Sequence, residues 1–174
     1  MSEVLAAPSP YRTEHFLGDD NMKLVDETVS EVFGMMLGLE TSVLPEPSTD
    51  VVPASALRTA IVGFSGALRG ACEVRMASMP ARTVTSAMLG NPLVEEDDPS
   101  IDDAVGEICN MLAGGWKNRI AALSSACALS PPMIISGSNY VFKIGTPCIK
   151  FVRTYQFDGL TMQITMQCEE LSRG

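Results

Sequence analysis

Apolar side chains recur at helical spacing in two separate segments of the chain. The first segment runs from about residue 20 to 37, and Gly38 is a suitable residue to end it. Its apolar positions are Val25, Val29, Val32 and Met36. The second segment runs from residue 101 to about 124. Its buried stripe is expected to contain Ile101, Val105, Ile108, Leu112 and Trp116.

The second helix has clear signals at both ends. Ser100 is a good N-cap, and Asp103 stands three residues later, as in a capping box. Pro131 and Pro132 prevent the helix from continuing into the segment that follows. These signals predict one long, well-specified helix near the middle of the chain.

Between and after these helices, the pattern predicts strands. Segments 58–64 and 70–77 are typical of two strands joined by a hairpin, and a short helix should follow from Ser78 to Gly90. Further strands are expected at 133–136, 147–154 and 160–168, with Asp158-Gly159 as the last hairpin turn. The proline-rich segment 45–55 is expected to be a loop or an irregular edge strand. The order predicts an α+β domain with helices packed on a sheet.

An internal repeat refines this prediction. When the chain is shifted by 76 residues, segment 25–38 aligns with segment 101–114, and the acids, apolar positions and final glycine coincide. A chance match between two amphipathic helices is the alternative. The repeat favours a single domain over 19–174 with two pseudo-symmetric halves, at about 19–92 and 93–174, after a flexible arm at 1–18.

One face of the second helix carries polar groups opposite the apolar stripe. It consists of Asp103, Glu107, Asn110 and Gly114. Glycine within a helix lowers stability by about 1 kcal/mol relative to alanine, and here it is doubled as Gly114-Gly115. A bare backbone patch would let another surface approach closely. The alternatives are a solvated face without function and close helix–helix packing inside the domain.

Composition narrows the function classes. The formal net charge is -9 with 12 Lys and Arg residues, so nucleic acid and anionic lipid are disfavoured as partners. The five cysteines form no Cys-x-x-Cys pair and His15 is the only histidine, so we expect reduced thiols and no metal site. Neither a signal peptide nor a membrane-spanning run is recognised, which favours the cytoplasm. Most of the eleven methionines are expected to fill the core.

The polar face resembles a known active-site signature. Asp103-x-x-x-Glu107-x-x-Asn110, followed about two dozen residues later by a proline, is similar to the motif of the CheC/CheX/FliY chemotaxis phosphatases. The proline would be Pro131 or Pro132, slightly nearer Asn110 than is usual. The resemblance extends over about residues 20–170. It implies a pseudo-two-fold duplication in which long helices pack on a shared, mainly antiparallel sheet.

The resemblance also implies a mechanism in two-component signalling. The protein would hydrolyse the aspartyl phosphate of a CheY-like response-regulator receiver domain. Asn110 would hold the attacking water, Glu107 would pair with a lysine of the receiver, and Asp103 and Gly114 would contribute to docking. The protein would need no cofactor of its own, because the Mg²⁺ would belong to the receiver. Positioning of the attacking water and of the docked receiver would suffice, because phosphoryl transfer depends mainly on positioning and charge stabilisation.

The repeat bears on the number of active sites. In the first half, Glu31 keeps the acid, but Gly34 occupies the position of Asn110 and has no amide to orient water. One site per chain favours CheX over CheC, and CheX-like proteins are expected to form homodimers through sheet edges. The alternative function is a non-catalytic module that binds a receiver or a flagellar-switch component.

Overall fold

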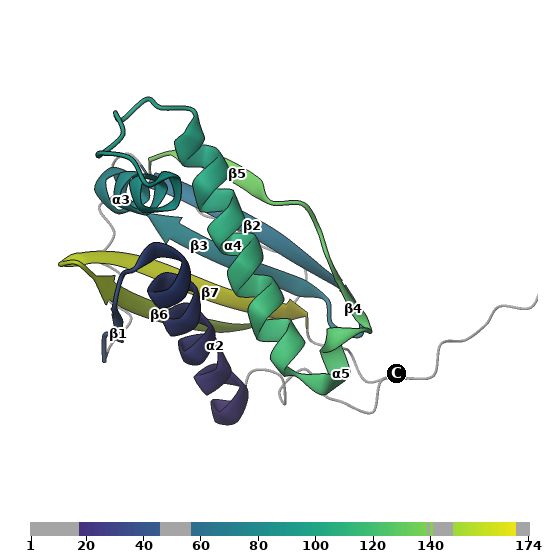
Figure 1. Ribbon diagram of the computed structural model, residues 1–174. Coiled ribbons are helices and arrows are strands. Elements are labelled where there is room, and N and C mark those ends of the chain that lie inside the picture. The colour runs from purple at the N-terminus through teal and green to yellow at the C-terminus, as the bar shows by residue number, and fades with distance from the viewer. Residues whose placement is uncertain (1–17, 46–56, 139, 141–147, 170–174) are drawn as a thin grey trace, which may run out of the picture.

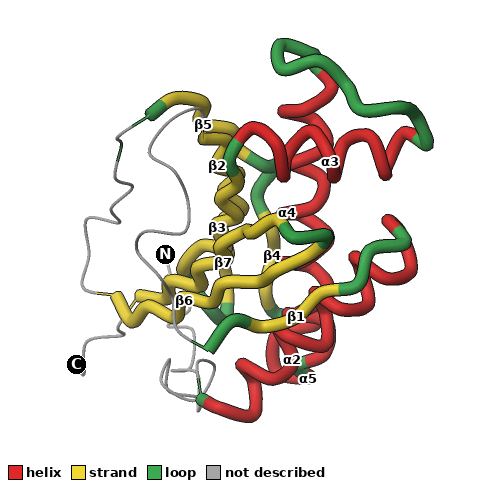
Figure 2. The backbone as a smooth tube through the Cα atoms, turned by 90° about the vertical axis from the view of Figure 1, so that its left-hand side faces the viewer, coloured by secondary structure: helices red, strands yellow, loops and turns green. Residues whose placement is uncertain are grey.

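The computed structural model describes residues 18–45, 57–138, 140 and 148–169. Helices cover one face of a single curved sheet (Figures 1 and 2). The helical elements are α2 (Asp19–Glu31), the π-helical η1 (Val32–Leu37), α3 (Ser78–Leu89), α4 (Ser100–Arg119) and α5 (Ala121–Ser124). The strands are β1 (Thr41–Val43), β2 (Leu57–Gly66), β3 (Gly70–Met76), β4 (Cys127–Leu129), β5 (Met133–Gly137), β6 (Cys148–Phe157) and β7 (Leu160–Glu169).

The strand order is β1-β6-β7-β3-β2-β4, and β5 also pairs with β2. Every recorded pair among the described strands is antiparallel. The turn between β6 and β7 has positive φ at both Asp158 and Gly159, as two-residue hairpins favour. The prediction of an α+β fold with a mainly antiparallel sheet is therefore confirmed.

Two hairpins form the centre of the sheet. The β2–β3 hairpin and the β6–β7 hairpin meet along β3 and β7, where Glu73 pairs with Thr165. The short strand β1 crosses over to pair with β6, while β4 and β5 pair with β2. A duplicated unit would produce this arrangement. The division near residue 92 stays a prediction, and the expected arm at 1–18 lies outside the described residues apart from Gly18.

The core lies between the helices and the sheet face that they cover. All five residues of the predicted α4 stripe are buried, so this prediction is confirmed. Trp116 packs against Phe64 of β2, with their ring centroids 5.5 Å apart. Its indole nitrogen donates a hydrogen bond of 3.1 Å to the carbonyl oxygen of Asn21, which joins α4 to the beginning of α2.

The first long helix differs from its prediction. The α-helical part ends at Glu31 and continues as the π-helical η1, after which Gly38 (φ 66°) ends the helix as predicted. A π-helix has more residues per turn, so side chains beyond this point change phase. Met36, the last of the recurring apolar positions, therefore does not share the buried side of the helix. Met36 is 61% exposed, whereas Phe33 is fully buried.

The cap of α4 also differs from its prediction. Ser100 is the first helical residue, and the N-cap position belongs to Pro99. The carboxylate of Asp98 accepts hydrogen bonds from the backbone N–H of Ser100 at 2.9 Å and from its hydroxyl at 2.6 Å. These bonds lower the pKa of Asp98 below its ordinary value. The helix ends at Arg119, because Ile120 is extended.

Other expectations have mixed outcomes. The three-residue strands β1 and β4 were not predicted, and the proline-rich loop falls almost wholly outside the described residues.

Six of the ten described methionines are buried or pack against the core. The other four, Met35, Met36, Met79 and Met133, are exposed. The four described cysteine side chains are buried thiols outside any disulfide.

Candidate functional site

The predicted polar face lies on the side of α4 that points away from the sheet. Asp103 and Glu107 are exposed, while Asn110 and Gly114 are half-buried. Since an α-helix turns about 100° per residue, these four positions fall within about 60° of one another. Within the described part of the chain, no hydrogen bond or ion pair engages the side chains of Asp103, Glu107 and Asn110. Two carboxylates and an amide are thus directed outward from one rigid helix.

One flank of this face packs against β2 and β5. Asp102 forms an ion pair with Arg58 of β2 (Oδ1 to Nε, 3.0 Å), and its carboxylate also accepts a weak hydrogen bond of 3.5 Å from Ser136. Gly106 is buried. A Cβ at this position would lie 3.3 Å from Cγ of Pro132 and 3.2 Å from Cδ1 of Ile134. Pro132, immediately before β5, and Ile134, within β5, therefore approach the α4 backbone one turn before Asn110.

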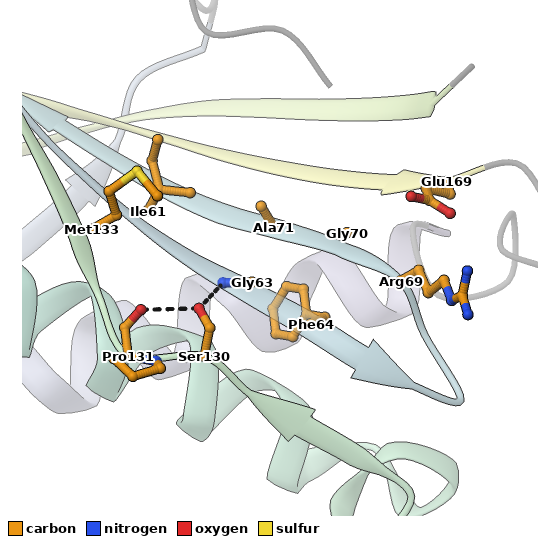
Figure 3. A pocket seen from close by; sticks show the side chains of 10 residues that line it. All are labelled: Ile61, Gly63, Phe64, Arg69, Gly70, Ala71, Ser130, Pro131, Met133 and Glu169. Carbon is orange, nitrogen blue, oxygen red and sulfur yellow. Dashed lines mark hydrogen bonds between the residues drawn. The ribbon is translucent and has the colours of Figure 1, made fainter. Parts of the chain in front are cut away.

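The two consecutive prolines lie in different environments. Pro132 contacts α4 at Gly106, whereas Pro131 lines a pocket of about 400 Å³ (Figure 3). Ser130 also lines this pocket. Its hydroxyl accepts a 2.8 Å hydrogen bond from the Gly63 backbone N–H and donates a 2.9 Å bond to the Pro131 carbonyl. The proline next to the polar face is therefore Pro132.

The other flank of α4 packs against α2. A Cβ on Gly115 would lie 2.6 Å from Cγ2 of Thr28, so this glycine is required for close helix–helix packing. Its neighbour Gly114 is different. The nearest atom to a Cβ there would be Cδ1 of Leu129, at an ordinary 3.7 Å. The glycine pair thus serves two surfaces: Gly115 meets α2, and Gly114 leaves backbone open on the polar face.

The first-half counterpart of the polar face has different surroundings. Arg119 of α4 forms an ion pair with Glu31 and lies 3.9 Å from the carboxylate of Glu27. Its Nε also donates a 3.0 Å hydrogen bond to the Thr28 hydroxyl. Gly34 is exposed within π-helical η1, with no atom near the position of a Cβ. Glu31 therefore joins two helices, rather than standing free like Glu107.

Sequence reasoning missed three residues of α4 that contact neighbouring elements: Asp102, Gly106 and Arg119. Gly106 had a signal, because a glycine inside a long helix needs a reason. The charged residues had none, since their partners are distant in sequence. Among the described residues, no group of three His, Cys, Asp or Glu side chains is arranged to hold a metal ion. None of the described helices is both long and apolar enough to cross a membrane.

Comparison with known proteins identifies the family. The family model described as chemotaxis phosphatase CheX matches residues 58–150, which is more than half of the chain and includes the whole of α4. The CheY-P phosphatase CheX of Thermotoga maritima is 26% identical over 119 residues, covering 68% of this chain and 74% of that protein.

Solved structures share the fold. CheX from Vibrio vulnificus superposes with a TM-score of 0.70 at 20% identity, covering 86% of this chain and 97% of that chain. A CheX–CheY–BeF3–Mg²⁺ complex from Borrelia burgdorferi gives a TM-score of 0.66 at 21% identity, covering 87% of this chain and 99% of the matched chain. The family match and the shared fold agree, and the chain belongs to the CheX family of chemotaxis phosphatases.

Proposed function

We propose that this protein hydrolyses the aspartyl phosphate of a CheY-like receiver domain, and that the polar face of α4 is its active surface. The observation that carries the proposal is the outward Asn110 amide, which has no side-chain partner in the described chain and lies one turn from the exposed Glu107. The family membership supports phosphatase chemistry. The complex of the Borrelia burgdorferi relative with CheY supports a receiver as the partner.

The proposed reaction is a displacement by water at phosphorus. Asn110 accepts a hydrogen bond from the water through Oδ1 or donates one through Nδ2, which holds the water oxygen in line with the phosphorus–oxygen bond to be broken. The water oxygen bonds to phosphorus, and the aspartate carboxylate of the receiver leaves with the electron pair. The water protons remain with inorganic phosphate and solvent. Positioning and charge stabilisation account for most of the catalysis in such transfers.

Docking is assigned to the remainder of the face. Glu107 is proposed to pair with a lysine of the receiver, and Asp103 adds a second negative charge one turn earlier. Gly114 leaves room for the receiver backbone to approach. Mg²⁺ is expected on the receiver. On this chain, Pro132 is the proposed motif proline, because it lies against Gly106 of α4, whereas Pro131 lines the pocket.

The decisive experiment replaces Asn110 with alanine. Phosphate release from a phosphorylated receiver should fall to the receiver's own autodephosphorylation rate, while circular dichroism and affinity for a beryllofluoride-loaded receiver stay close to wild type. Asn118→Ala is the matched control, since Asn118 is an exposed amide near the other end of the same helix. If Asn110→Ala kept activity within a few-fold of wild type, the amide would have no catalytic role.

Glu107→Ala tests docking separately. Truncating one partner of a desolvated ion pair costs roughly 2–5 kcal/mol, so affinity for the beryllofluoride-loaded receiver should fall on the order of a hundredfold. Glu96→Ala, in the exposed loop before α4, is the control and should bind normally. Unchanged affinity and turnover for Glu107→Ala would remove this residue from the interface. Binding by wild-type protein without turnover would support a non-catalytic module instead.

Two further parts of the proposal concern assembly and location. We expect a homodimer formed through sheet edges and a reaction in the cytoplasm, where thiols stay reduced. Sedimentation velocity at micromolar concentration measures the first. A monomer at every concentration would contradict it without affecting the single-chain active face.

A further inference from the structure

Gly106 is buried where α4 packs against the beginning of β5 and the connection that leads into it. A Cβ there would lie 3.2 Å from Cδ1 of Ile134, and 3.3 Å and 3.4 Å from Cγ and Cβ of Pro132. These separations are shorter than ordinary van der Waals contacts between carbon atoms. A side chain at position 106 therefore requires either the helix or the connection to move by a few tenths of an ångström.

The connection is poorly able to move. The ring of Pro132 fixes its own φ, and Pro131 before it is restricted in the same way. Ile134 is held in the β2–β5 ladder, where it pairs with Ala60. The displacement would therefore fall largely on α4, apart from what the flexible end of Ile134 absorbs. Asn110 lies one turn further along this helix, on the side that leans toward the same connection.

We infer that Gly106 is a positioning residue: its bare backbone sets how closely α4 seats against Pro132 and Ile134, and this seating fixes the Asn110 amide for catalysis. The inference rests on the proposed phosphatase function. Glycine lowers helix stability by about 1 kcal/mol relative to alanine, so its presence in the middle of α4 needs a compensating role, and the close approach supplies one. The role acts through Asn110, because Gly106 itself is covered.

Kinetics of a glycine-to-alanine series can test this inference. Misplacing a reacting group by about 1 Å can reduce the rate about a hundredfold, so a shift of a few tenths should lower kcat of Gly106→Ala roughly threefold to tenfold. KM should stay within about twofold, because the variant keeps every docking side chain of α4 and an ion pair tolerates a shift of a few tenths of an ångström better than an in-line attack does. Gly34→Ala is the matched control, with a helical glycine in open space, and should retain both constants.

Two further variants separate positioning from other effects. Gly114→Ala adds a methyl group to the outward face without an internal clash, so it should raise KM more than it lowers kcat. Adding Ile134→Val to Gly106→Ala removes Cδ1, the nearest clashing atom, and should recover part of the lost kcat. This double variant also serves if Gly106→Ala alone folds poorly.

Each outcome decides the inference. In an active wild-type background, a Gly106→Ala kcat within twofold of wild type would overturn it. An equal loss in Gly34→Ala, or a Gly106→Ala defect confined to KM, would also overturn it. If wild-type protein fails to accelerate dephosphorylation at all, then the proposed function fails first. If Asn110→Ala is inactive while Gly106→Ala is normal, then the proposed function survives and only the positioning role is lost.

Discussion

Replacing Gly115 with alanine should destabilise the protein, although alanine is the better helix former. The added Cβ would lie 2.6 Å from Cγ2 of Thr28, a distance that real Cβ atoms do not tolerate without a shift. Overpacking of this kind costs about 1–3 kcal/mol. The gain from helix propensity is about 0.5–1 kcal/mol. The expected net loss in the free energy of unfolding is therefore roughly 0–2.5 kcal/mol, with a midpoint of about 1 kcal/mol.

The adjacent glycine is a matched control within the same helix. At Gly114 the nearest atom to the new Cβ would be 3.7 Å away, so propensity should dominate and stability should rise by about 0.5–1 kcal/mol. For a chain of this length, 1 kcal/mol corresponds to about 2–4 °C in Tm. The two variants should therefore shift Tm in opposite directions.

The assay is urea unfolding followed by fluorescence and far-ultraviolet circular dichroism. Trp116 is the only tryptophan in the sequence and is buried next to this helix contact. Thr28→Ser removes the clashing Cγ2 but keeps the hydroxyl that donates to the Leu24 carbonyl and accepts from Arg119. The pair Gly115→Ala and Thr28→Ser should therefore show favourable coupling in a double-mutant cycle. If Gly115→Ala proved as stable as Gly114→Ala, the close approach of α2 and α4 would be refuted.

Three further predictions follow from the contacts of α4 and the buried thiols. Glu31→Ala should leave phosphate release unchanged and lower the free energy of unfolding by less than about 1 kcal/mol, because its ion pair with Arg119 is partly exposed. Steady-state turnover and urea unfolding measure these two effects. A loss of activity as severe as that of Asn110→Ala would contradict the single-site interpretation. Asp98→Ala should lower Tm at pH 7. Since the pKa of Asp98 is lower in the folded protein, its carboxylate stabilises the fold above the ordinary carboxyl pKa, and this stabilisation disappears as acid protonates the carboxylate. The difference in Tm between variant and wild type should therefore shrink below pH about 4. Cys72, whose pKa is raised by its hydrogen bond with Cys109 and by burial, should resist iodoacetamide until urea unfolds the protein, as peptide mapping would show.

Local patterns in the sequence predicted the element types well, because helix phase and strand alternation are local properties. The apolar stripe of α4 and the turn at Asp158 are examples, since each depends on residues within a few positions. The helical spacing of the apolar residues does not hold at Met36, because η1 winds as a π-helix. The strands β1 and β4 were missed because three residues carry no periodic signal and are defined by partners more than sixty residues away.

For the candidate site, helical spacing alone determined that Asp103, Glu107, Asn110 and Gly114 share one face. Spacing could not determine what lies on either side of that face. Tertiary structure decided that Pro132 seats on Gly106, that Gly115 meets Thr28 while Gly114 stays open, and that Glu31 is paired with Arg119. The physical reason is that a helix pattern records only which side of the helix is apolar. These contacts depend on differences of a few tenths of an ångström in how closely segments far apart in the chain pack together.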